Sequence, residues 1–137
     1  MLYQVLNGIN KLCYKLLVEP DIKRGMAKCG SNTKIVRDSE FYPLKNIYVG
    51  KNVSIGPYAL FWTQKANIYI GDYVLIGPRV TIITGDHRKD IVGRHITEVH
   101  DDEKNKSDDQ DVIIENGVCI GANVTILPGV KIGKNAL

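Results

Sequence analysis

The sequence predicts an all-β protein, a parallel β-helix built from six-residue repeats and preceded by short N-terminal helices. Between residues 112 and 137, an aliphatic residue recurs at every sixth position: Ile114, Ile120, Ile126 and Ile132. Three residues after each of them stands Gly or Asn, which adopt a positive φ at low cost and therefore suit a tight corner: Gly117, Asn123, Gly129 and Asn135. A period of six fits neither an amphipathic helix nor an alternating strand, but it is typical of a β-helix.

The same period recurs upstream in two runs, which are Val49, Ile55 and Phe61, and then Ile70, Ile76 and Ile82. A second inward series falls four positions after members of the first, at Val53, Ala59, Val74, Val80, Val118, Val124, Val130 and Ala136. Positions 49 and 70 are 21 residues apart, which is one coil of 18 residues plus an insertion of three. We therefore expect roughly four coils, with parallel strands of about three to five residues stacked in three faces.

We expect the β-helix domain to span residues 29–137. Its first part, residues 29–46, follows the period only weakly, although Ile35, Phe41 and Leu44 fit an imperfect first coil. Pro43 disfavours a long regular strand there. Residues 88–111 break the period and form a long excursion loop, and loops of this length are usually functional or mobile.

Residues 1–28 carry apolar residues at helical spacing. We expect a first helix that ends at Pro20, and a second short helix from Asp21 to about Lys28. The favoured interpretation is a helical cap on the open end of the β-helix, because terminal repeats of a solenoid need covering. The alternative is a helix that lies in a membrane interface, since the segment is too short and polar for an integral membrane span.

Length and composition exclude several classes of protein. A chain of 137 residues corresponds to one domain. The 18 Lys and Arg residues exceed the 15 Asp and Glu residues by three but are scattered, so no nucleic-acid partner is expected. Three cysteines without a CxxC motif indicate reduced thiols in a cytoplasmic protein.

Residues 47–87 and 112–137 resemble the hexapeptide-repeat acyltransferases, in particular the maltose/galactoside and the capsule or lipopolysaccharide O-acetyltransferases. The matching strings are VTIITGDH at residues 80–87 and IGANVTILPGV at residues 120–130. The resemblance implies a left-handed parallel β-helix, a handedness that the spacing itself does not determine. It also implies an acetyl-CoA-dependent O-acetyltransferase that acts on a sugar or polysaccharide precursor, and a homotrimer with active sites in the grooves between subunits.

The resemblance places the catalytic histidine of these enzymes at His87. Imidazole titrates near pH 6.5, so its neutral form can remove the proton of a sugar hydroxyl that attacks a thioester, without a covalent acyl-enzyme. Asp86 is expected to orient the imidazole or simply to solvate the turn. Taken without the resemblance, a histidine after Gly-Asp is an ordinary surface turn residue.

The resemblance also suggests where the coenzyme binds. Cys119 stands where many relatives have Trp, and Gly121 and Ala122 match positions along which the pantetheine arm runs, because small residues let a thin ligand reach the backbone. Trp62, the only Trp of the chain, follows an inward position and is expected to face outward. It is a platform for the sugar or, by the interpretation we favour, packing at a subunit contact.

Two alternatives to an acetyltransferase remain open. His95 and His100 have a spacing similar to zinc ligands of the γ-class carbonic anhydrases, but both lie in the loop, and we expect no metal site. The resembling enzymes also continue past the position of Leu137 with at least one more coil that holds much of the coenzyme. With these C-terminal coils missing, the chain would be a truncated, non-catalytic interaction solenoid.

Overall fold

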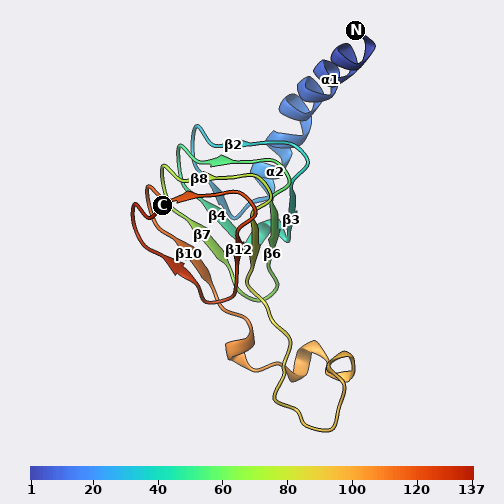
Figure 1. Cartoon of the computed structure of the whole chain (residues 1–137), viewed down its shortest axis with the longest axis vertical. Coiled ribbons are helices and arrows are strands. Elements are labelled where there is room, and N and C mark those ends of the chain that lie inside the picture. The colour runs from blue at the N-terminus through green and yellow to red at the C-terminus, as the bar shows by residue number, and fades with distance from the viewer.

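Corners of positive φ turn the chain through three stacked faces (Figure 1). The computed structural model describes residues 1–137. The four corners predicted from Gly and Asn all have a positive φ: Gly117, Asn123, Gly129 and Asn135. Tyr58, Tyr73 and Arg79 also have φ values of 57° to 58°. The stacked coils hold these three bulky residues in a conformation that such side chains rarely adopt.

The stacked coils form a three-sided prism. Each of its faces is a parallel sheet, and we name the three sheets A, B and C. Sheet A contains β1 (Lys28–Cys29), β4 (Ile47–Val49), β7 (Ile68–Ile70), β10 (Val112–Ile114) and β13 (Lys131–Ile132). Sheet B contains β2 (Lys34–Ile35), β5 (Ser54–Ile55), β8 (Leu75–Ile76) and β11 (Cys119–Ile120). Sheet C contains β3 (Glu40–Tyr42), β6 (Leu60–Trp62), β9 (Thr81–Ile83) and β12 (Thr125–Ile126). The strands have two or three residues and are shorter than expected, because the corners take up the rest of each repeat.

The core is a stack of aliphatic side chains in register from coil to coil. In sheet B, for example, Ile55 pairs with Ile35 on one side and with Ile76 on the other. Six of the seven isoleucines expected inside are buried, whereas Ile132 is half-buried. The buried six are Ile70, Ile76, Ile82, Ile114, Ile120 and Ile126. Val124 and Val130 are exposed, contrary to expectation, because they lie in the last coil, where the chain stacks on one side only.

The segment 29–46 forms a complete first coil rather than an imperfect one. Strands β1 to β3 pair with β4 to β6 in continuous register, and a 3-10 turn at Leu44–Asn46 (η2) closes the coil. Thr33 takes the inward position at which the period would require an aliphatic residue. Its buried hydroxyl donates a hydrogen bond to the Gly50 carbonyl at 2.9 Å, so a polar residue is tolerated there.

The N-terminal helices differ from the expectation at Pro20. Helix α1 (Leu2–Cys13) continues through a π-helical turn (η1, Tyr14–Val18) into α2 (Glu19–Gly25). Pro20 lies two residues after the π-helical turn, where the helical hydrogen-bond pattern already changes, and it does not end the helical segment. The second helix therefore starts before Asp21 and ends before Lys28.

Only part of the segment 1–28 covers the β-helix. Ile22 of α2 and the following Met26 pack on the core, and the Glu19 carboxylate accepts a hydrogen bond from the Ile35 amide at 3.1 Å. Helix α1 buries no residue and projects away from the prism (Figure 1). The cap predicted for the whole segment is thus formed by α2, since α1 does not turn its apolar face to the prism. None of the helices is both long enough and apolar enough to cross a membrane.

The excursion loop leaves the prism between β9 and β10 and extends away from it on the side opposite to α1 (Figure 1). It contains three short 3-10 turns, which are Ile96–Glu98 (η3), Asp101–Glu103 (η4) and Lys106–Asp108 (η5).

Candidate active site

The two ends of the excursion loop are joined at its base. The Asp86 amide donates a hydrogen bond to the Asp108 carbonyl at 2.8 Å, and the Gln110 amide donates to the Thr84 carbonyl at 2.9 Å. Gly85 forms an antiparallel bridge with Asp109. A Cβ atom at Gly85 would lie 2.6 Å from Asp109 Oδ1, so a larger residue at this position would displace the Asp109 carboxylate.

A buried ion pair anchors the loop base to the coil. Lys104 Nζ lies 3.1 Å from Asp109 Oδ1, and the two side chains are only 5% and 6% exposed. The same ammonium donates a hydrogen bond to Gln64 Oε1 at 3.0 Å, in the turn between β6 and β7. Asp109 also bridges to Gly85, so the pair and Gln64 link the start of the loop to the coil.

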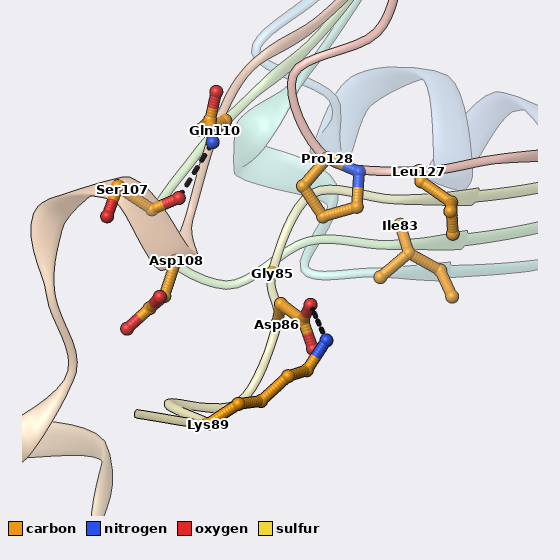
Figure 2. Close-up of a pocket in the computed structure, with 9 residues that line it drawn as sticks. All are labelled: Ile83, Gly85, Asp86, Lys89, Ser107, Asp108, Gln110, Leu127 and Pro128. Atoms are coloured by element: carbon orange, nitrogen blue, oxygen red, sulfur yellow. Dashed lines mark hydrogen bonds and ion pairs between the residues drawn. The ribbon is translucent and has the colours of Figure 1, made fainter. Parts of the chain in front are cut away.

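Two hollows of about 440 Å³ each flank the segment 83–86. The first, which we name the His87 hollow, is lined by Leu60, Trp62, Gln64, Ile83, Gly85, Asp86, His87 and Lys104. The second, which we name the Leu127 hollow, is shown in Figure 2. It is lined by Ile83, by residues at the end of the loop, and by Leu127 and Pro128 of the next coil. The loop base is therefore bordered by concave surface on both sides, as ligand sites require.

Asp86 does not use its carboxylate on the His87 imidazole. Its Oδ1 accepts a hydrogen bond from the His87 backbone amide at 2.7 Å, and its Oδ2 pairs with the Lys89 ammonium (Figure 2). The Lys89 hydrogen bond and then the His87 amide hold the pKa of the Asp86 carboxyl below its usual range. Asp86 is therefore an ionised group at neutral pH that fixes the backbone of His87, while the imidazole stays exposed.

The structure brings some of the predicted site residues together. Trp62 is 43% exposed on the outer surface of β6, as expected, and it lines the same hollow as Asp86 and His87. Cys119 belongs to β11 of sheet B, and Gly121 and Ala122 lie in the corner between β11 and β12 of sheet C, whereas His87 follows β9 of sheet C. The hollow that His87 lines contains none of the three predicted coenzyme residues.

Three residues of the site were not anticipated from the sequence. Tyr42 lies one coil below Trp62 in register, with its ring tilted against the indole at 5.5 Å. Tyr42 and Trp62 occupy equivalent positions in successive coils, so the spacing of the coils in the sequence could have revealed this pair. Lys104 and Asp109 stand among many charged loop residues, and no local pattern distinguishes them.

His95 and His100 have structural roles in the loop. The backbone amide of His95 donates to Glu98 at 3.1 Å, and that of His100 donates to Glu103 at 3.0 Å. The Arg94 guanidinium, together with the His100 amide, lowers the pKa of Glu103 to about 2. Within the chain, no group of three or more His, Cys, Asp or Glu side chains is placed to hold a metal ion.

Comparison with known proteins places the fold. The family described as bacterial transferase hexapeptide (six repeats) matches residues 111–137. A crystal structure of a hexapeptide-repeat-containing acetyltransferase from Vibrio cholerae O1 biovar eltor, complexed with acetyl coenzyme A, is similar with a TM-score of 0.65 and 28% sequence identity. The similarity covers 93% of this chain and 68% of that chain. No curated protein matches.

The resemblance to the hexapeptide-repeat acyltransferases is thereby confirmed, and the fold is the left-handed parallel β-helix of these proteins. The three stacked parallel sheets described above are the faces of that helix.

The buried ion pair predicts how the loop responds to substitution. Asp109→Ala leaves the Lys104 ammonium buried without its partner, a loss that typically costs about 3–5 kcal/mol. Trypsin should therefore cleave the loop at least about tenfold faster than in the wild type. Asp101→Ala is the matched control, because it removes a carboxylate that is 67% exposed and 3.9 Å from the same ammonium. Equal cleavage rates for both variants would contradict an anchoring role.

Proposed function

We propose that this chain is an acetyl-CoA-dependent O-acetyltransferase that acts on a hydroxyl of a sugar or of a polysaccharide or lipopolysaccharide precursor. The observation that carries the proposal is the position of His87. Its imidazole is exposed beside a hollow at the loop base, in a fold shared with an acetyltransferase crystallised with acetyl coenzyme A. A cytoplasmic location is part of the proposal and is supported by three free thiols at Cys13, Cys29 and Cys119.

His87 acts as the general base in this mechanism. A sugar hydroxyl does not ionise by itself at neutral pH, so the neutral imidazole accepts its proton while the oxygen attacks the thioester carbonyl. The carbon–sulfur bond then breaks, the oxygen keeps the acetyl group, and the imidazolium returns the proton to the coenzyme thiolate. Transfer is direct, and no residue of the chain becomes acylated.

Asp86 positions the base through the backbone. Its carboxylate accepts the His87 amide hydrogen bond and pairs with Lys89, which keeps the start of the loop in one conformation. Because catalytic groups lose much of their effect when they are displaced by about 1 Å, this support of the backbone matters even without contact to the imidazole.

Coenzyme binding is assigned to Cys119, Gly121 and Ala122. A Cβ atom built on Gly121 would meet nothing within 4 Å, which supports free access of a thin ligand to the backbone there. None of these residues lines the His87 hollow, so a complete site needs a second subunit. We therefore include a homotrimer in the proposal, with His87 of one subunit facing residues 119–125 of the next and the excursion loop reaching across the groove.

Substitution of the base tests the mechanism. His87→Ala should lower turnover by about a hundredfold to ten-thousandfold, the usual contribution of general acid–base catalysis, with little change in acetyl-CoA affinity measured by calorimetry. His100→Ala, which removes an imidazole from the same loop, should turn over like the wild type. Near wild-type turnover of His87→Ala would remove this residue from the mechanism. If wild-type protein did not bind acetyl-CoA at all, the non-catalytic interaction solenoid would be the better description.

The oligomeric state tests whether His87 of one subunit can face residues 119–125 of the next subunit. Light scattering of the wild type at micromolar concentration should give about three times the chain mass of 15.3 kDa, because closed cyclic symmetry makes every groove identical. A monomer would overturn the trimer and, with it, the active-site proposal.

Trp62 offers an apolar platform for the acceptor. Its indole and the Tyr42 ring form a second shallow groove of about 370 Å³ with Glu40, Phe41 and Leu60, and Trp62 also borders the His87 hollow. A sugar ring stacked on such a surface is held by its apolar face.

Trp62→Ala separates the two interpretations of this residue. As a platform, Trp62 should contribute to acceptor binding, so its loss should raise the acceptor KM by about threefold to tenfold while the trimer persists. Tyr73→Ala, which removes another exposed ring, is the control. Dissociation of the trimer by Trp62→Ala would assign Trp62 to the subunit contact instead.

A further inference from the structure

Helix α1 leaves a continuous apolar face without any partner in the chain. Leu2, Val5, Leu6, Ile9 and Leu12 lie within an arc of about 120° on this helix, and each is at least half exposed. Two further exposed leucines follow in the π-helical turn. Contiguous apolar surface of this kind marks a binding site on soluble proteins.

The opposite, polar face of the helical segment is the one that contacts the β-helix. The Asn7 side chain accepts a hydrogen bond from the Arg37 guanidinium at 2.8 Å. The Tyr14 side chain lines a hollow together with Arg37, Asp38 and Ser39 of the first coil, and its partial burial, before any charge effect, raises the pKa of Tyr14 to about 12. An amphipathic helix usually turns its apolar face to the core. Here the contacts with the first coil direct that face away from the prism.

The charge of the helix complements an anionic surface. Lys11 and Lys15 are the only charged side chains among residues 1–18, so the segment is positively charged. At helical spacing, Lys11 lies almost opposite Ile9, and Tyr3 lies near the border of the apolar face. Lysines on the polar face and an aromatic ring near the boundary are features of helices that lie flat in a lipid headgroup layer.

We propose that α1 is an interfacial helix that binds the protein to an anionic lipid surface. The apolar face enters the layer between headgroups and acyl chains, while Lys11 and Lys15 reach back to lipid phosphates. A bundle of α1 helices from several copies is less favourable, because the apolar pattern covers only about two heptads and would gather lysines without any acidic partner. The inference goes beyond the proposed acetyltransferase and does not rest on it.

Flotation of the full chain with lipid vesicles tests this proposal, because bound protein rises with the vesicles while aggregates stay below. Wild-type protein should float with vesicles of phosphatidylcholine and phosphatidylglycerol, and much less with phosphatidylcholine alone. Leu6→Gln/Ile9→Gln should lower the bound fraction at least about tenfold, since both side chains would otherwise be buried in lipid. Lys11→Gln/Lys15→Gln should lower it roughly tenfold or more, and added salt should do the same to the wild type.

Gln4→Ser is the matched control on the polar face of the same helix and should float like the wild type. All variants should keep the wild-type melting temperature, because α1 buries no residue. Wild-type protein that stays below the vesicles would overturn the proposal, as would full binding by Leu6→Gln/Ile9→Gln. If this variant instead lowers the particle mass in light scattering, with no binding of the wild type to vesicles, the apolar face covers another copy of the chain.

Discussion

Everything in this structure depends on the stacking of aliphatic side chains between successive coils. A single coil has only one inward residue or two on each face and cannot exclude water from them. When Val49, Ile70 and Ile114 lie in register, each covers the next, and the parallel backbone hydrogen bonds follow. The register also decides which residues point outward, because neighbours of an inward position in a strand lie on the other face.

The site is formed where this stack is interrupted. Sheet C brings Trp62 and Ile83 to the outer surface in register, and the chain then leaves the prism before it reaches sheet A. The excursion loop lies outside the aliphatic stack and is not stabilised by it, so a different interaction holds the loop against the coil. The buried pair of Lys104 and Asp109, with Gln64, ties the loop to the coil below it. His87 is thus exposed and yet attached to a rigid base.

The prism has a convex surface, which is why the proposed active site is placed between two copies of the chain. The two hollows at the loop base are open, and neither is lined by Cys119, Gly121 or Ala122, the residues proposed for the coenzyme. The two ends of the molecule also differ. Helix α2 covers the first coil with apolar contacts, whereas α1 uses polar contacts and keeps its apolar face free.

The sequence by itself determined the six-residue period, the inward isoleucines and the corners at Gly and Asn, because these are local properties that repeat. It also placed Trp62 outside and His87 at the start of the loop. Only the tertiary structure decided the features that the six-residue period does not encode. Thr33 is accepted in the core because a carbonyl of the next coil satisfies its hydroxyl. Lys104 and Asp109 become a pair, and Asp86 binds a backbone amide and Lys89, because the folded loop base brings their partners together. Such contacts depend on long-range geometry that no local spacing encodes.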